Sequence, residues 1–343
     1  MAAEVITMTQ RPQPGNGDLY DVVIVGGGAA GLSAALTLGR ARRSVVVIDG
    51  GEPRNAPAAH MHGFLSREGL PPGQLLEMGR QEVARYGVQV IAGRARSAAR
   101  DGAGPDRTES EGGFAVELET GWTVGARRLL VTTGITDELP AIPGLRQRWG
   151  RDVLHCPYCH GWEVRDQPIG VLGISPMSVH QALLFRQWTD RLIYLPHIGP
   201  HPDPEQAEQL AARGIRVVPG EVTGVEVDDD RLSGVRLRSG ESIPLQALVL
   251  APLAVPRAEV LDSLGLEATE HPMGVGAYIT ADKTGLTSVP GVWAAGNLTD
   301  PSANVLASAA AGATAAAAIN ADLVAEDTRR AVEAGRDRLS AEV

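Results

Sequence analysis

A glycine-rich turn between an apolar strand and a helix constrains the fold of this chain more than any other feature. Residues 20–25 (YDVVIV) form a continuous apolar run, which is typical of a buried parallel strand. The turn 26–31 (GGGAAG) follows, then an Ala- and Leu-rich stretch to about Arg40, and a second apolar strand that ends at Asp49. This pattern predicts a βαβ unit that binds a dinucleotide.

Each position of the turn has an expected role. Gly26 permits the tight turn, Gly28 lets the backbone approach a pyrophosphate, and Gly31 allows close packing of helix on strand. The first N–H groups of the helix attract the phosphates, and Asp49 is placed to accept a hydrogen bond from a ribose hydroxyl. The predicted binding residues are Gly26, Gly28, Ala29, Ala30, Gly31, Asp49 and Gly50. The turn alone leaves FAD and NAD both open.

The rest of the 343-residue chain predicts two domains. A second βαβ pattern begins at Ile169, and proline-bearing stretches flank this region. We expect an α/β fold with two doubly wound, three-layer, Rossmann-like dinucleotide-binding domains, the second inserted into the first. The expected boundaries are 1–19 for a disordered arm, 20–145 and 254–325 for the first domain, 146–253 for the inserted domain, and 326–343 for a C-terminal tail or helix. Residues 101–113 read as a solvated hairpin tip.

Charge and hydropathy exclude some classes of partner. The formal net charge of −10 argues against nucleic acid or an anionic membrane as the main partner. No export signal is visible at the N-terminus. The Ala-rich run 307–318 is too short and too weakly apolar to span a bilayer, and we expect no other stretch that could. A cytoplasmic protein without membrane attachment is therefore expected.

The two cysteines, Cys156 and Cys159, stand in the segment 155–163 (HCPYCHGWE). Four interpretations compete: covalent haem attachment, a zinc site, inert buried thiols, and a dithiol/disulfide redox centre. Haem attachment would require export, and a zinc site would need four ligands from six consecutive residues, so no metal is expected. Pro157 suits the first position of a helix, which places Cys156 at a helix N-terminus, where the dipole favours a thiolate. The redox centre is favoured.

Two later segments resemble the auxiliary FAD motifs of flavoproteins with two dinucleotide-binding domains. They are 131–134 (VTTG) and 291–297 (GVWAAGN), and the resemblance implies that FAD is the cofactor. It adds Thr133, Gly134, Gly296 and Asn297 to the cofactor-binding residues. Asn297 replaces the family's Asp, which bonds the ribityl chain, and its side-chain oxygen can still accept a hydrogen bond.

The order of these motifs over residues 20–325 resembles that of the low-molecular-weight thioredoxin reductases. The resemblance implies that Cys159 faces the flavin, that Cys156 exchanges with substrate, and that the protein is a homodimer. It also places His62 beside the flavin ring, and Asn304 and Val305 where the reductases carry an Arg-Gln pair. The family's Asp after the second cysteine is His160 here. In that respect the centre resembles the dithiol oxidases that close disulfides in natural products such as gliotoxin and holomycin, and it makes His160 the candidate acid/base.

The second glycine turn departs from the reductase pattern. Ser175 stands at its middle glycine in 173–178 (GISPMS), Pro176 removes an N–H, and no arginine follows the next strand to hold a 2′-phosphate. We therefore expect loss of NADPH binding and oxidation of a small-molecule dithiol, with O2 as acceptor giving H2O2. An NADPH-dependent disulfide reductase of the thioredoxin-reductase type is the alternative. A non-enzymatic redox sensor is a third interpretation.

Overall fold

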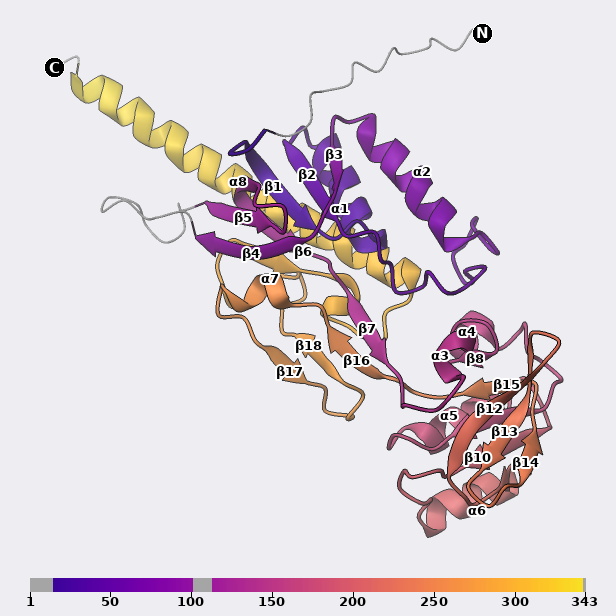
Figure 1. Cartoon of the computed structure of the whole chain (residues 1–343). Helices are drawn as coiled ribbons and strands as arrows, with labels where there is room; N and C mark the ends of the chain where they lie inside the picture. The colour runs from indigo at the N-terminus through magenta and orange to yellow at the C-terminus, as the bar shows by residue number, and fades with distance from the viewer. Residues whose placement is uncertain (1–14, 101–112, 342–343) are drawn as a thin grey trace, which may run out of the picture.

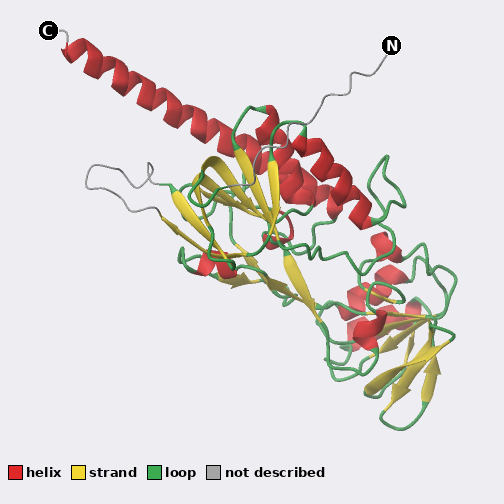
Figure 2. Ribbon diagram, turned by 45° about the horizontal axis from the view of Figure 1, so that its top comes forward, coloured by secondary structure: helices red, strands yellow, loops and turns green. Residues whose placement is uncertain are grey.

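The computed structural model describes residues 15–100 and 113–341. Within them, the two largest β-sheets belong to separate domains (Figures 1 and 2). The first sheet has the order β3-β2-β1-β6-β5-β4, and β19 also pairs with β6. Its strands are β1 (Leu19–Val25), β2 (Val45–Asp49), β3 (Gln89–Ala92), β4 (Ala95–Arg100), β5 (Phe114–Leu118), β6 (Thr123–Val131) and β19 (Val292–Ala294). β1, β2, β3, β6 and β19 are parallel, and β4 and β5 add an antiparallel edge.

The first domain has three layers because both faces of this sheet are covered. Side chains of α1 (Ala29–Arg40), α2 (Pro72–Ala84) and α8 (Val305–Ala341) form a core on one face. The short helix α7 (Glu259–Asp262) and the hairpin β17 (Ala268–Glu270) and β18 (Ala277–Ile279) belong to the other side, where Val260, Leu261 and Ile279 join the core. The 3₁₀ turn η1 (Gly296–Leu298) follows β19.

The inserted domain is built on a parallel sheet of order β11-β10-β9-β15-β8. Its strands are β8 (Val153–Leu154), β9 (Ile169–Leu172), β10 (Leu192–Leu195), β11 (Arg216–Val217) and β15 (Ala247–Val249). An antiparallel sheet of β12 (Val222–Asp228), β13 (Arg231–Leu237) and β14 (Ser242–Pro244) packs beside it. The helices are α3 (Leu145–Arg148), α4 (Pro157–His160), α5 (Ser178–Phe185) and α6 (Pro204–Ala212). The predicted fold class is confirmed.

Two antiparallel strands, β7 (Ile135–Glu138) and β16 (Leu253–Pro256), carry the chain into and out of the inserted domain. Both are held to the loop after β2 by arginines. Arg54 forms hydrogen bonds of 2.9 and 2.7 Å with the two carboxylate oxygens of Asp137 on β7. Arg257, directly after β16, donates to the Glu52 carbonyl at 2.7 Å.

The termini differ from the sequence-based expectations. Residues 1–14 of the expected arm and 101–112 of the expected hairpin tip lie outside the described residues. Residues 15–19 are not a free arm, because the Gly17 N–H donates to the Thr123 carbonyl at 2.8 Å and β1 begins at Leu19. Residues 326–341, expected as a C-terminal tail or helix, continue α8 without a break.

α8 contains an 18-residue stretch that is long and apolar enough, by length and composition alone, to cross a membrane. The expectation that no such stretch exists is therefore wrong by that criterion. In the structure, however, Ala315, Ile319 and Leu323 of α8 are fully buried in the core shared with α1. The first half of α8 is a core helix of the first domain.

Candidate functional site

One large cleft, of about 1280 Å³, lies between the two domains and collects nearly every residue singled out from the sequence. Its lining includes Gly26, Gly28, Ala29, Ala30, Asp49, Gly50, His62, Thr133, Gly134, Cys156, Cys159, His160, Gly296, Asn297, Asn304 and Val305. Gly31 is the exception and lies behind this surface. Segments distant in sequence meet here because β1, β2 and β6 are parallel and all end at the same edge of the sheet.

The glycine turn forms a cradle with room for a phosphate. Gly26 has a φ of +110°, and a Cβ there would lie 2.5 Å from the Thr132 carbonyl oxygen. A Cβ at Gly31 would lie 1.9 Å from the Gly26 carbonyl oxygen, so only glycine lets α1 approach the strand this closely. A Cβ at Gly28 would meet nothing within 4 Å and would fill the space that the cradle leaves open. No side chain caps this start of α1, so the arrangement fits a dinucleotide pyrophosphate.

Asp49 and Asn297 both line the cleft, and each is held by its own hydrogen bonds. Asp49 accepts hydrogen bonds from the Gly27 and Gly51 N–H groups, both at 3.2 Å, at the carboxyl end of β2. The Asn297 amide nitrogen donates to the carbonyls of Pro301 at 3.3 Å and Ala303 at 2.8 Å. An Asp could not make these donations. Asn297 therefore fixes the loop before α8, and its side-chain oxygen is left to accept from a ligand.

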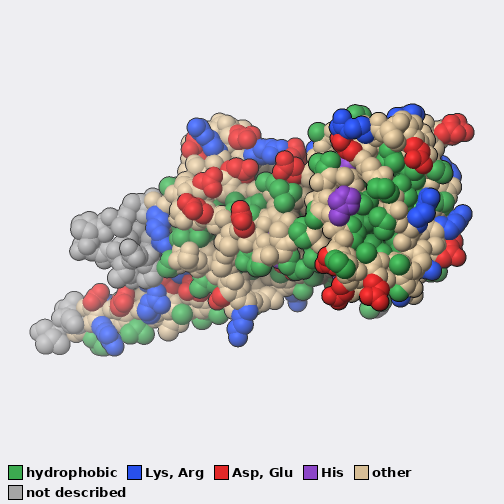
Figure 3. Space-filling view, turned by 90° about the horizontal axis from the view of Figure 1, so that it is seen from below, with side chains coloured by type: hydrophobic (Ala, Val, Ile, Leu, Met, Phe, Trp, Pro, Cys, Tyr) green, Lys and Arg blue, Asp and Glu red, His purple; other side chains and the backbone are tan. Residues whose placement is uncertain are grey.

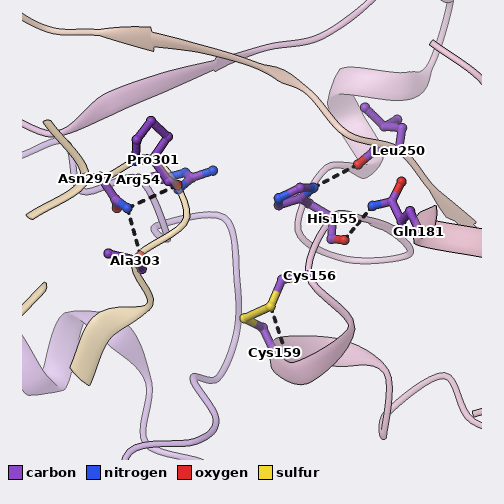
Figure 4. Close-up of a disulfide and its surroundings, with 9 residues drawn as sticks. All are labelled: Arg54, His155, Cys156, Cys159, Gln181, Leu250, Asn297, Pro301 and Ala303. Carbon is purple, nitrogen blue, oxygen red and sulfur yellow. Dashed lines mark hydrogen bonds between the residues drawn. A yellow bond between two sulfur atoms is a disulfide. The ribbon is translucent and has the colours of Figure 1, made fainter. Parts of the chain in front are cut away.

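The two cysteines form a disulfide across the first turn of α4, with Cα atoms 5.2 Å apart. As expected from Pro157, Cys156 is the N-cap residue, and its sulfur accepts a hydrogen bond from the Cys159 N–H at 3.2 Å. Figure 4 shows the disulfide facing the loop of Asn297 and Ala303, which belongs to the first domain. Within residues 15–100 and 113–341, no three His, Cys, Asp or Glu side chains are grouped to hold a metal ion.

Two histidines flank the disulfide in chemically different settings. The His160 Nε2 atom is buried without a hydrogen-bond partner in the described part of the chain. Burial lowers the pKa of His160; the charge of Glu163 partly opposes this shift, and His62 adds a smaller lowering. The ring is therefore neutral near pH 7 and able to accept a proton. The His155 Nδ1 atom lies 3.2 Å from the Leu250 carbonyl oxygen, and burial followed by the charge of Arg54 lowers the pKa of His155.

His62 connects the loop after β2 with the redox-active segment. Its Nδ1 atom lies 2.6 Å from Glu68 Oε1 in the same loop, and its Nε2 atom lies 3.5 Å from Glu163 Oε1 in the inserted domain. Hydrogen bonds from His62 and then from the Gly63 N–H lower the pKa of Glu68. His62 thus lies at the junction of the two domains. It is far from both cysteines in sequence, and Glu163, which stands shortly after Cys159, joins it to their segment.

The second glycine turn is occupied by its own side chains. The Ser178 hydroxyl, in a fully buried residue, accepts from the N–H groups of Ile174 at 3.2 Å and Ser175 at 3.1 Å. The Ser175 hydroxyl accepts from the Met177 N–H at 3.2 Å. The N–H groups that would hold a phosphate at this position are therefore already paired.

The loop after β10 packs directly against the second glycine turn. The Gly199 N–H donates to the Gly173 carbonyl at 3.1 Å. His197 lies in the segment 195–199, where the resemblance to the reductases would place phosphate-binding arginines. It has a φ of +54° and accepts the Val222 N–H at its Nδ1 atom. Burial lowers the pKa of His197 and so keeps its ring uncharged. This loop offers no cation to a 2′-phosphate.

Sequence reasoning missed several residues of the cleft. Arg54 was not identified, although it pairs with Asp137 and also donates to the Pro301 carbonyl at 3.0 Å. Gln181, which also lines the cleft, was likewise missed, and so was Glu163, which lies outside the lining and contacts His62. Their contacts join segments far apart in the chain, and the one available signal was the closeness of Glu163 to the cysteine pair in sequence.

Comparison with known proteins gives one matching family model, described as pyridine nucleotide-disulphide oxidoreductase, over residues 20–319. Among solved structures, "Crystal structure of HlmI" is 47% identical with a TM-score of 0.87, and the match covers 94% of this chain and 98% of that one.

Two curated relatives are both named as reductases. "Thioredoxin reductase sirT" of Leptosphaeria maculans is 29% identical over 94% of this chain and 98% of its own. "Probable thioredoxin reductase" of Arthroderma benhamiae is 36% identical over 48% of this chain, and the match spans only 40% of that relative.

Proposed function

Because the chain belongs to the pyridine nucleotide-disulphide oxidoreductase family, we propose that it is an FAD-dependent dithiol oxidase. It would convert a small-molecule dithiol into an intramolecular disulfide through Cys156 and Cys159, with O2 as acceptor and H2O2 as second product. Members of this family are flavoproteins, and FAD is the cofactor of this chain. The resemblance of the segment 155–160 to the dithiol oxidases of natural-product pathways supports a role in natural-product biosynthesis.

The proposal rests on the second glycine turn, where backbone N–H groups donate hydrogen bonds to serine hydroxyls of the same segment. Ser175 and Ser178 occupy the N–H groups that a reductase offers to NADPH. The disulfide, by contrast, opens on the cleft beside the first glycine turn. Electrons would therefore reach the cofactor from a thiol substrate and not from a nicotinamide.

The residues of the chain would act in two exchanges. A substrate thiolate attacks the Cys156 sulfur, and Cys159 leaves as a thiolate. The second substrate thiolate then attacks the substrate sulfur of this mixed disulfide, which releases the product disulfide and a Cys156 thiolate. The substrate loses two protons, one to His160 and one to solvent, and the cysteine pair gains two electrons as it becomes two thiolates. Bound FAD supplies the two-electron acceptor that links the cysteine pair to O2.

The test uses the purified FAD-loaded protein. Dithiothreitol in air should cause oxygen uptake, and NADPH under anaerobic conditions should leave the flavin oxidised. Cys159→Ser should keep FAD and lose turnover. Rapid flavin reduction by NADPH without dithiol-dependent oxygen uptake would instead establish the second candidate, an NADPH-dependent disulfide reductase, which the names of the fungal relatives favour.

We further propose a homodimer, on the resemblance, and a cytoplasmic location, on the N-terminal sequence; sedimentation would test the first and cell fractionation the second. The partners proposed are the dithiol and O2, without nucleic acid or membrane. The face drawn in Figure 3 shows acidic and basic side chains interspersed.

A further inference from the structure

The helix α5 presents one side to the cleft. Met177, directly before α5, and His180, Gln181 and Leu184 within it all line the cleft and recur at the spacing of a single helical face. The Gln181 side chain donates to the His155 carbonyl at 2.8 Å, which fixes α5 beside the residue that precedes Cys156 (Figure 4). This face therefore borders the same cavity as the disulfide.

The chemistry of this face is apolar and uncharged. Met177 and Leu184 are half-buried, and His180 is exposed. None of these three side chains carries a fixed charge, whereas the cradle of the first domain is bordered by Arg54, Arg94, Arg96 and Arg257. An apolar ring packs well on such a surface, and an imidazole can donate or accept one hydrogen bond at its edge.

The closed glycine turn explains why this face is free for another ligand. With the N–H groups of residues 174, 175 and 177 paired to serine hydroxyls, the start of α5 has no phosphate site. The part of the domain that would support a nicotinamide nucleotide remains as a wall of the cleft next to the sulfurs.

We propose that Met177, His180 and Leu184 form the subsite that selects the substrate. The subsite takes the apolar ring of a small, uncharged dithiol, holds both thiols toward Cys156, and uses His180 to bind one polar group of the ring. This inference rests on the proposed function and adds the substrate class to it.

Two dithiols test the subsite in the FAD-loaded enzyme: 1,2-bis(mercaptomethyl)benzene, which carries a ring, and dithiothreitol, which does not. We expect Leu184→Ser and Met177→Ser to lower kcat/KM for the arene dithiol about tenfold while changing that for dithiothreitol less than about twofold. His180→Ala should raise KM for a third dithiol, 4-(hydroxymethyl)-1,2-bis(mercaptomethyl)benzene, and leave KM for the unsubstituted arene dithiol unchanged. Ile198→Ser and His201→Ala are matched controls, because both residues lie outside the cleft lining.

Binding is measured separately from turnover, by calorimetric titration of each protein with the cyclic disulfide of the arene dithiol. Weaker binding to Leu184→Ser than to Ile198→Ser supports the subsite. Equal binding to the two variants, together with an unchanged ratio of kcat/KM for the arene dithiol to that for dithiothreitol, would overturn it. Faster oxidation of reduced thioredoxin than of either dithiol would also overturn it. If no dithiol causes oxygen uptake, the proposed function fails, and the titration still decides the subsite.

Discussion

The two glycines Gly28 and Gly31 lie in one turn but have different physical roles. Gly31→Ala places a Cβ 1.9 Å from the Gly26 carbonyl oxygen, so the backbone must shift. We expect the free energy of unfolding to fall by about 1–3 kcal/mol. Gly28→Ala meets no atom within 4 Å and should leave the stability of the apoprotein unchanged, but its methyl group should reduce FAD affinity. Thermal unfolding of the apoproteins and titration with FAD measure the two effects, and an equal loss of apoprotein stability in both variants would contradict this assignment.

His160 predicts a specific pH dependence. Its pKa is lowered by burial, so the neutral ring that accepts a proton persists to a lower pH than an ordinary imidazole would allow. The rate should fall only when the pH drops through this lowered pKa and the ring becomes charged. His160→Asn should slow thiol oxidation and remove this acidic inflection from the profile of kcat against pH. An inflection that persists in the variant would show that another group is the base.

Among individual residues, the sequence predicted those that belong to a motif with fixed spacing, such as the first glycine turn and the cysteine pair. Each of these depends on neighbours within a few positions along the chain. Asn297 was predicted to face the ribityl chain, but its role in holding the Pro301 and Ala303 carbonyls was not, because that depends on the path of a loop. Contacts across the cleft, such as His62 with Glu163, leave no periodic signal.

Among the elements, the strands β7 and β16 determine how the domains are joined. Arg54 binds Asp137 on β7 in a two-bonded ion pair, and the Asp137 side chain is only 8% exposed. Arg54→Ala leaves this carboxylate without its partner and should lower the free energy of unfolding by about 1.5–3 kcal/mol. Asp137→Asn keeps a hydrogen-bond acceptor for Arg54 and should cost less. Urea denaturation compares the two variants, and a larger loss from Asp137→Asn would contradict the role of the ion pair.

Buried strands such as β1 and β9 were predictable because apolar runs bounded by glycine indicate parallel strands. β7 was not predicted, since three of its four residues (Thr136, Asp137 and Glu138) are polar and its pairing with β16 spans the whole inserted domain. The length of α8 was also missed. Its small residues and its charged residues suggested two segments, whereas no helix-breaking residue separates them.

Over the whole molecule, α8 projects from the body of the first domain, as Figures 1 and 2 show. Its last residue with a buried side chain is Glu326, whose Oε2 atom lies 2.8 Å from Arg128 Nη2. The next residue, Asp327, binds Arg43 at 2.7 Å. These ion pairs fasten the helix to β6 and to the start of β2, while residues 331–339 are all exposed.

Removal of residues 331–343 should therefore leave the fold, the melting temperature and FAD content unchanged, since the described part of this segment buries no side chain. Glu326→Ala should instead lower the free energy of unfolding by about 1.5–3 kcal/mol, because Arg128 is buried and loses one of its two acidic partners. Arg329→Ala, at an exposed position in the same turn, is the control. Thermal unfolding measures the melting temperature of each variant, and flavin absorbance measures its FAD content. A melting temperature that falls on truncation as far as in Glu326→Ala would mean that the projecting end of α8 contributes to stability.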